Sequence, residues 1–435
     1  MTRYNQTYII GISFVSALGG YLFGFDFAVI SGALPFLQRT FALDAYWEGF
    51  ATGCLALGAI AGCLIAGTIC DKKGRRTGLL LAAAVFGVSS LAMALSPTRF
   101  FFIGSRFTAG IGVGMASLLS PMYIAEVSPA PFRGRMVAIN QLTVVIGILV
   151  TNLINYTLRN NGDDAWRWMF GLGAVPSALF LLGAWWLPES PRWLIDAGRE
   201  EEARRTLHKI GGADFAAQTI AGIQHAPQKS NAAAGIFKKA VLPTVILGIS
   251  LAVFQQFCGI NVVFNYTPKI FASIGVGTDG QLFQTVLIGG VNLVFTLLAM
   301  ALVDRLGRKP LMLIGAVGLT ALYIIIARQL HNGSVHVSWF LLTAIGTYAL
   351  SLAPVTWVLI AEIFPGKIRS AATSVAVLSL WLAYFILVFT FPPLFAHLGD
   401  KTFYIYAAIC SVGALYIAAK VKETKGKTLE ELTVG

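Results

Sequence analysis

Charged side chains are scarce in this sequence: Asp, Glu, Lys and Arg together make up 12% of the residues, whereas hydrophobic types make up 56%. A mean hydropathy of +0.73 excludes an ordinary water-soluble globular chain. Paired cysteine spacing is lacking too. The five cysteines lie singly in or at the ends of apolar runs, so the sequence indicates neither a disulfide framework nor a zinc site. We interpret each cysteine as a small buried hydrophobic residue.

Signals of enzyme chemistry are also lacking. The sequence holds no nucleophile motif and no phosphate-binding loop, and its five histidines include no pair with metal-ligand spacing. All of them fall in loops or near the ends of apolar runs: His208, His225, His331, His336 and His397. We therefore expect no enzyme, no resident metal and no cofactor.

Long apolar runs are abundant. A helix that crosses a bilayer needs about 20 consecutive apolar residues. Twelve such runs are centred near residues 20, 58, 87, 112, 147, 177, 254, 292, 320, 349, 383 and 411. The first run is too long for a signal-peptide core and lacks a small-residue cleavage site, so we expect it to be retained as a helix. The pattern predicts an all-α membrane protein with twelve transmembrane helices.

Positive charge is distributed unevenly along the chain. If the N-terminus is cytoplasmic, 24 of the 32 Lys and Arg residues fall in cytoplasmic segments, seven fall outside, and Arg106 alone lies within a run. This is the positive-inside distribution, which predicts a multi-pass protein of the plasma membrane with both termini in the cytoplasm. Topology thus explains the net charge of +12, and we expect membrane lipid as a partner and no nucleic acid.

Two pairs of loops repeat at nearly one spacing. The segment "GTICDKKGRR" (67–76) corresponds to "ALVDRLGRKP" (301–310) at an offset of 233, and "EVSPAPFR" (126–133) corresponds to "EIFPGKIR" (362–369) at an offset of 236. An even number of spans separates the copies, which predicts a duplicated six-helix unit with both copies in the same orientation. The expected domains are a six-helix bundle at 1–187, a cytoplasmic linker with intracellular helices at 188–240, a second bundle at 241–419 and a cytoplasmic tail at 420–435.

The charges near these repeated loops allow two interpretations. A Gly-Arg pair can be an ordinary tight turn beside topogenic charge. Both copies, however, carry an acid ahead of the basic pair and a Glu…Arg pair seven residues apart further along the chain. Opposite charges at corresponding helix ends can pair across the halves, and a network can bias a two-state equilibrium although each exposed pair is worth at most about 1 kcal/mol. The predicted cytoplasmic gate consists of Asp71, Arg75, Arg76, Glu126, Arg133, Glu189, Asp304, Arg308, Glu362 and Arg369.

Further motifs, in this order and spacing, resemble those of the sugar porter family of the major facilitator superfamily. They are "RFTAGIGVG" (106–114), "PMYIAEVSPAPFRG" (121–134), "PESPRWL" (188–194), "QQFCGIN" (255–261), "WVLIAEIFP" (357–365) and "ETKGKTLEE" (423–431). The resemblance extends from residue 19 to residue 431. It implies two six-helix bundles that alternate access to a central site, and monosaccharides or related polyols as substrates. It also implies transport by proton symport or by facilitated diffusion.

The stretch "GGYLFGFDFAVISG" (19–32) places a single carboxylate, Asp26, in the first apolar run. Asp26 lies about ten residues before the outer end of its run and Arg106 about seven after the outer start of the fourth, so the helical rise puts them at similar depth. One interpretation is a static ion pair between two helices. The other is a proton site, because ionised groups inside spans usually pair and mark a transport path. The resemblance favours the proton site, since members with an acid here tend to be proton-coupled whereas facilitators tend to carry an amide.

A sugar presents hydroxyl groups and an apolar ring face, so its site needs side chains that donate and accept hydrogen bonds, and an aromatic surface. Amides meet the first need without a charge, although any single amide can equally form an interhelical hydrogen bond. The segment between Gln256 and Asn261 must bend for both to reach one ligand, and Gly259 permits that bend. The resemblance supports Gln141, Gln255, Gln256, Asn261, Asn292 and Trp357 as sugar-binding residues. Three further aromatic residues are predicted to complete the wall: Phe23, Tyr266 and Trp381.

Four positions depart from the family pattern. Leu380 replaces a usual amide, Asn265 a usual Tyr and Ala353 a usual Gly. Ile148 stands where some pentose-recognising members carry Gln. These differences bear on which sugar is bound, not on transport itself. We expect a monomeric, proton-coupled importer of a monosaccharide, such as the hexose glucose. The alternatives are a proton-independent facilitator of the same fold and a sugar sensor that does not transport.

Overall fold

The computed structural model is built from helices, and no strand occurs among the residues that it describes. These are residues 4–225, 241–364 and 368–423, of which the side chains at 303–305, 361 and 369–370 are not described.

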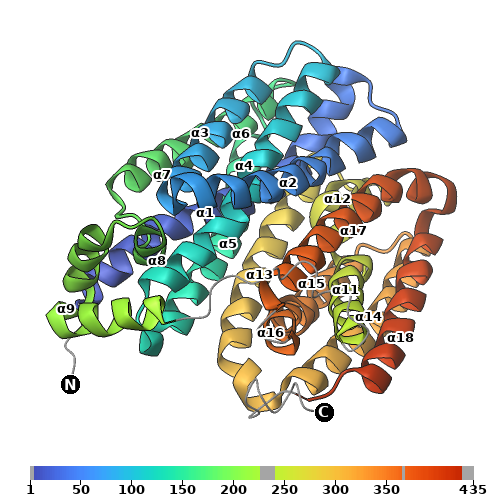
Figure 1. The fold of residues 1–435 in the computed structure, drawn as a ribbon. Helices are drawn as coiled ribbons and strands as arrows, with labels where there is room; N and C mark the ends of the chain where they lie inside the picture. The colour runs from blue at the N-terminus through green and yellow to red at the C-terminus, as the bar shows by residue number, and fades with distance from the viewer. Residues whose placement is uncertain (1–3, 226–240, 365–367, 424–435) are drawn as a thin grey trace. The chain divides into compact units, whose positions relative to one another are not determined.

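The described part of the N-terminal half contains nine helices, coloured from blue to lime green in Figure 1. They are α1 (Gln6–Phe41), α2 (Ala45–Lys73), α3 (Arg75–Ala94), α4 (Arg99–Val127), α5 (Ala130–Leu158), α6 (Ala165–Gly171), α7 (Ala174–Trp186), α8 (Pro191–Asp196) and α9 (Glu200–Gln224).

The described part of the C-terminal half continues the helical pattern, from green-yellow to red in the same figure. Its elements are α11 (Leu242–Phe257), α12 (Ile260–Ala272), α13 (Thr278–Leu306), α14 (Arg308–His331), α15 (Val337–Leu350), α16 (Leu352–Ile363), α17 (Arg369–Leu398), the short 3₁₀ helix η1 (Gly399–Lys401) and α18 (Thr402–Lys420).

Most of these helices are long and apolar enough to cross a bilayer. Eleven candidate spans occur among the described residues, and the last of them, Ala371–Lys420, runs through α17 and α18 in succession. With 30 and 19 residues, α17 and α18 are each of a length that can cross a bilayer. The predicted all-α fold with twelve transmembrane helices is confirmed.

The chain divides into two compact units by its contacts. Unit 1 contains Met1–Val29, Cys54–Ile154 and Asp164–Gln228, and unit 2 contains Ile30–Gly53, Asn155–Asp163 and Lys229–Gly435. Helices α1, α2 and α5 therefore each contribute to both units. The domain boundaries expected from the sequence follow chain order instead, and they remain a prediction.

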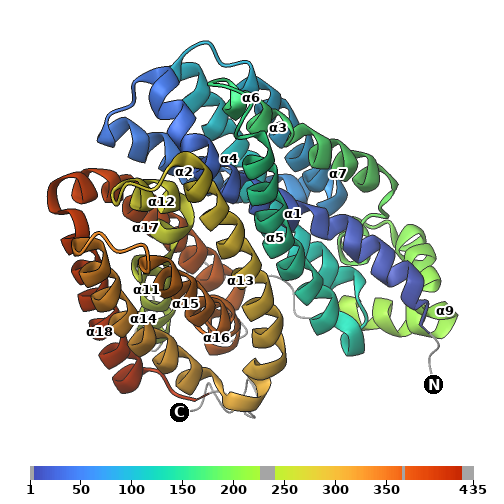
Figure 2. The same ribbon diagram turned by 180° about the vertical axis from the view of Figure 1, so that it is seen from behind.

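Packing inside the two units follows the internal repeat. In unit 1, α3 packs against α4 and α7, and in unit 2, α14 packs against α15 and α18. Figures 1 and 2 both show α14 and α18 side by side. Helices α3 and α14 are the ones that follow the repeated Gly-Arg loops, so they occupy equivalent places in the two units.

Small residues let α2 and α4 approach closely. A Cβ atom on Gly58 would lie 2.0 Å from the carbonyl oxygen of Phe107, and one on Gly110 would lie 2.2 Å from that of Leu55. Helix pairs in membranes rely on such close packing, because lipid provides no hydrophobic drive for association. Gly110 lies one helical turn beyond Arg106, so this contact also positions the buried arginine.

The linker after the first bundle contains helices, as predicted. Ser190 caps α8, since its hydroxyl accepts a hydrogen bond from a backbone N–H of the first turn. Helix α9 lies beside α8 and bends at Gly212, where φ is 84°. Its apolar face forms a small core around Leu207, Ala216 and Ile220. Helix α9 therefore has one apolar face that packs within the linker.

Candidate functional site

Asp26 and Arg106 form an ion pair inside unit 1, as predicted from their depth. Arg106 Nη1 lies 3.5 Å from Asp26 Oδ1, and both side chains are 0% exposed. Asp26 Oδ2 and the Nε and Nη2 atoms of Arg106 are buried without a hydrogen-bond partner among the described residues. Removing two charges from water is well compensated only when their remaining groups are also bonded. The pair is therefore a poor structural tie.

The backbone around Asp26 packs tightly in unit 1. Two residues earlier, a Cβ atom on Gly24 would lie 2.0 Å from the carbonyl oxygen of Val144 in α5. On the other side of the pair, the guanidinium of Arg106 lies 5.7 Å from the centre of the Phe170 ring. Because glycine allows α1 to touch α5, the carboxylate is carried into the interior of unit 1 instead of facing lipid.

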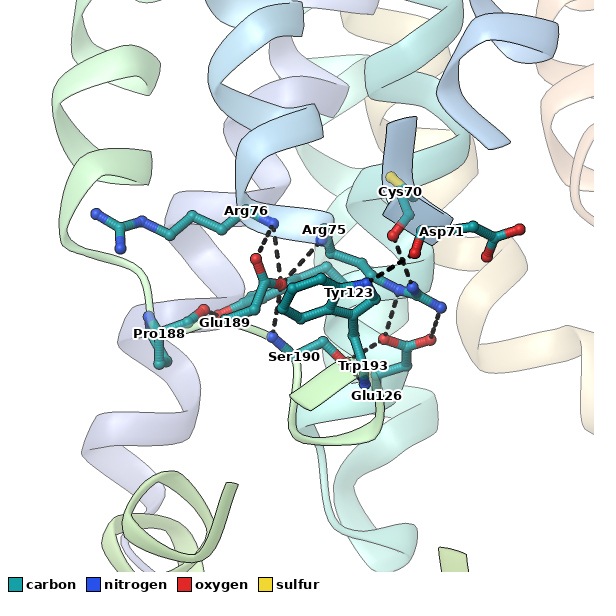
Figure 3. Close-up of polar contacts among 10 residues, drawn as sticks. All are labelled: Cys70, Asp71, Arg75, Arg76, Tyr123, Glu126, Pro188, Glu189, Ser190 and Trp193. Carbon is teal, nitrogen blue, oxygen red and sulfur yellow. Dashed lines mark hydrogen bonds and ion pairs between the residues drawn. The ribbon is translucent and has the colours of Figure 1, made fainter. Parts of the chain in front are cut away.

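A polar network joins the loop after α2 to the linker, and Figure 3 shows its members. Arg75 forms two bonds of 3.1 Å to the carboxylate of Glu126. Glu189 Oε1 accepts hydrogen bonds from the backbone N–H groups of Arg75 at 2.8 Å, Arg76 at 3.1 Å and Ser190 at 2.8 Å. Burial raises the pKa of the Glu189 carboxyl, although these three N–H groups favour its charged form. The Arg75–Glu126 pair thus joins the start of α3 to the end of α4, and Glu189 joins the start of α3 to the segment before α8.

Unit 2 repeats this arrangement. Arg308 lies 3.2 Å from Glu362, which corresponds to the Arg75–Glu126 pair. Glu423 accepts hydrogen bonds of 3.0 Å from the backbone N–H groups of Arg308 and Lys309, as Glu189 does at α3. The sequence interpretation did not include Glu423 in the gate. Its signal was present, since Glu423 follows Glu189 by 234 residues, close to the offsets of the other repeats.

The ion pairs seen among the predicted gate residues lie within single units. The remaining members bond differently: Arg76 donates to the carbonyl oxygen of Trp185, and Arg133 donates to that of Ala125 at 3.0 Å. The backbone carbonyl of Asp71 accepts from the Trp193 indole at 3.1 Å. The side chains of Asp304 and Arg369 lie outside the described residues. Pairing across the two halves stays a prediction.

Three predicted sugar-binding amides meet in unit 2. Asn261 donates to Gln256, which in turn donates to Gln255 at 3.0 Å. The helix is interrupted between Gln256 and Asn261: α11 ends at Phe257, α12 begins at Ile260, and Gly259 between them has a left-handed φ of 86°. The expected bend at Gly259 is confirmed. All three amides are nearly buried, with exposures of 3% to 6%, so they form a polar group inside the unit.

The other predicted sugar-binding residues are less closely grouped. Tyr266 is fully buried, and its hydroxyl donates to the carbonyl oxygen of Val388 at 2.8 Å. Asn292 on α13 and Trp381 on α17 are nearly buried, whereas Trp357 on α16 is 43% exposed. The remaining two come from the N-terminal half: Phe23 on α1, which is half-buried, and Gln141 on α5, which is exposed. Their roles stay predictions.

A second ion pair between helices was not predicted. Glu48 in the first turn of α2 bonds Lys269 at the end of α12, with side-chain exposures of 1% and 22%. Both residues belong to unit 2. The sequence interpretation gave neither Lys269 nor Glu48 a role. An acid at the start of the second apolar run was the available signal.

Comparison with known proteins identifies the family. A sequence profile described as "Sugar (and other) transporter" matches residues 12–435. The D-xylose-proton symporter of Escherichia coli strain K12 is 37% identical over 472 residues, covering 99% of this chain and 96% of the relative. The glucose transport protein of Synechocystis sp. is 39% identical over 458 residues, covering 98% and 97%.

A solved structure agrees in fold. The inward-open conformation of the xylose transporter XylE from E. coli has a TM-score of 0.87 and 35% sequence identity, covering 98% of this chain and 99% of that one. Another structure of XylE is described as a proton:xylose symporter of the major facilitator superfamily. The chain is a multi-pass membrane protein and belongs to the sugar transporter family of the major facilitator superfamily, whose members similar to it are transporters.

Proposed function

We propose that the chain is a secondary active transporter that imports a monosaccharide together with a proton by alternating access. The observation that carries this proposal is the Asp26–Arg106 pair, which is wholly buried and joined by one contact of 3.5 Å. The xylose relative, which is named as a proton symporter, supports the same kind of transport.

The physical reason is the cost of a charge inside the membrane. An ionised side chain within a span costs at least about 2.5–3.5 kcal/mol, so it needs either a partner or a change of protonation. A proton on Asp26 removes the negative charge that holds Arg106, so proton uptake is coupled to the release of Arg106. If each cycle carries one proton, a potential of 100 mV supplies about 2.3 kcal/mol, enough for about fiftyfold accumulation.

The buried amides of α11 and α12 are the proposed sugar-binding group. These amides can replace the hydrogen bonds among themselves with hydrogen bonds to sugar hydroxyls, so that no buried polar group is left unpaired. Ile148 on α5 is 6% exposed and offers no hydrogen bond where some pentose-recognising members carry Gln, which supports a hexose such as glucose. Because the relatives include a xylose symporter and a glucose transport protein, both sugars belong in the test.

The test is uptake by proteoliposomes with an acidic exterior, using D-glucose and D-xylose in parallel. We expect sugar influx to be accompanied by alkalinisation of the external medium. Asp26→Asn should abolish accumulation against a gradient, because an amide cannot take up a proton, while sugar exchange or binding remains measurable. Asp163→Asn is the matched control, since that carboxylate has a side-chain exposure of 80% and should leave coupling intact.

Two results would contradict the proposal. Influx without external alkalinisation would show a passive facilitator of the same fold. Accumulation by the Asp26→Asn protein would remove Asp26 from the coupling step. We also propose, from the charge distribution, that both termini lie on the cytoplasmic side of the plasma membrane. The expectation of a monomer stays a prediction.

A further inference from the structure

A cavity of about 430 Å³ opens in unit 1 between the beginning of α3, the segment that follows α7, and helices α8 and α9. Four cationic side chains line it: Lys73, Arg76, Arg199 and Arg205. Two carboxylates line it as well, Glu189 and Glu202, which leaves an excess of positive charge.

The two carboxylates are already engaged by other groups. Glu189 accepts hydrogen bonds from the backbone at the start of α3, and Glu202 binds Arg199 through two bonds of 2.7 Å. Among the described residues, no carboxylate lies within ion-pair distance of Lys73, Arg76 or Arg205. The cavity therefore carries an excess of two positive charges, and three of its cations form no ion pair among the described residues.

Arg76 is the most constrained of these cations. One of its terminal nitrogens donates to the carbonyl oxygen of Trp185, and its Nε atom is buried without a hydrogen-bond partner. Figure 3 shows its guanidinium extending away from the Arg75–Glu126 pair. A guanidinium presents a planar set of donors that matches the oxygens of a phosphate.

The position of the cavity indicates where such a phosphate comes from. Two candidate spans, Arg75–Ala94 and Ala165–Trp186, end at its rim. Trp185 and Trp186 are 64% and 85% exposed, and tryptophan is enriched where a helix leaves the hydrocarbon for the headgroup layer. Apolar side chains continue from this level along the outer faces of α3 and α7: Leu81, Val88, Leu179 and Leu182 are exposed.

We propose that this cavity binds the phosphate of an anionic phospholipid headgroup, with the acyl chains lying along α3 and α7. Lys73, Arg76 and Arg205 supply the charge, and the leaflet is the one on the side of α8 and α9. Basic pockets beside the cytoplasmic ends of spans attract anionic headgroups, and each nearby cation contributes about a fivefold increase in affinity. A soluble phosphate compound would lack the contact with the apolar faces.

The experiment counts bound lipid on the detergent-purified full chain by native mass spectrometry, with phosphatidylglycerol or phosphatidylcholine added. We expect phosphatidylglycerol to be retained selectively. The double variant Lys73→Gln/Arg205→Gln should bind it about 25-fold more weakly. The control Lys72→Gln/Lys209→Gln removes two exposed cations of the same helices that do not line the cavity, and it should bind like the original chain.

A competition arm separates the two sources of phosphate. Glycerol phosphate and inorganic phosphate at millimolar concentration should not displace the bound lipid. Displacement by either would overturn the lipid assignment. Equal retention of phosphatidylcholine, or an equal loss in the control variant, would show unspecific attraction and overturn the site itself. The comparison of the two lipids on the original chain decides this even if the cavity variant fails to fold.

Discussion

At the scale of single residues, the Asp26–Arg106 and Glu48–Lys269 pairs differ in how well their charges are compensated. The Asp26–Arg106 pair is 0% exposed and leaves three polar atoms without a partner. In the Glu48–Lys269 pair the lysine keeps 22% exposure, and one buried atom, Glu48 Oε1, lacks a hydrogen-bond partner among the described residues. A charge that only its partner stabilises is the one whose protonation changes most when the partner leaves. This difference supports the proposed proton exchange at Asp26, and we propose a holding role for Glu48.

The holding role predicts measurable energetic coupling between Glu48 and Lys269. Replacement of either one leaves the other charge poorly compensated, so Glu48→Gln or Lys269→Met alone should each destabilise the protein by about 1–3 kcal/mol. The double variant should lose less than the sum, with a coupling of about 0.5–3 kcal/mol. Thermal unfolding in detergent measures the cycle. The same cycle on Arg39 and Asp163, whose side chains are 55% and 80% exposed, should give a coupling near zero, and equal values for both cycles would refute the assignment.

At the scale of elements, each half uses a glycine turn closed by a carboxylate. Gly74 and Gly307 have φ values of 91° and 90°, a region that side chains rarely adopt. A Cβ atom on Gly74 would lie 2.2 Å from Glu189, and one on Gly307 would lie 2.8 Å from Glu423. These carboxylates bind the first N–H groups of α3 and α14, where the helix dipole favours negative charge. Glycine is thus required both by the backbone and by the neighbouring carboxylate.

This double requirement predicts the effect of adding one methyl group. Gly74→Ala and Gly307→Ala should each destabilise the protein by about 1–3 kcal/mol, because strain and displacement of the carboxylate add together. Gly67→Ala is the matched control: Gly67 lies inside α2, and nothing lies within 4 Å of its added Cβ atom. We expect it to be neutral or stabilising by up to about 1 kcal/mol, since alanine favours helix. If thermal unfolding showed that Gly67→Ala destabilises the protein as much as the other two variants do, the proposed role of the turn would be wrong.

At the scale of the whole molecule, the distribution of cations and the duplication act together. The repeat predicts that the equivalent Gly-Arg turns share one side of the membrane, and 24 of 32 cations share the predicted cytoplasmic side. The same prediction places helices α8 and α9 of the linker on the cytoplasmic side. In the proposed proton-coupled cycle, this predicted orientation sets the direction in which a proton gradient would drive transport.

The orientation predicts which residues a membrane-impermeant thiol reagent reaches in intact cells. A cysteine at the exposed outer loop, Asp163→Cys, should be labelled before permeabilisation. A cysteine on α9, Lys209→Cys, should be labelled only afterwards. The original chain gives the background, because four of its five cysteines are buried and Cys63 is part-buried. The reverse labelling order would show that the positive-inside interpretation has the wrong sign for this protein.

The fold and much of the site follow from patterns within short segments. Apolar runs predicted the spans, the Gly259 signal predicted the break between α11 and α12, and matching depths predicted the Asp26–Arg106 pair. The interpretation failed where a partner depended on distant packing. It missed Glu48, which bonds a lysine 221 residues away, and it missed Glu423 as the counterpart of Glu189.

The sequence by itself indicated that this chain spans a membrane, how many helices cross it, that its halves repeat, and which family it resembles. Hydropathy, charge bias and repeats act over segments of 10 to 30 residues, about the length that a bilayer imposes, so they can be read in chain order. The tertiary structure decided the pairings that the sequence interpretation lacked, those of Glu48 with Lys269 and of Glu423 with the start of α14. Ion pairs and helix caps depend on distances of about 3 Å between segments hundreds of positions apart, and only the packing of helices sets those distances.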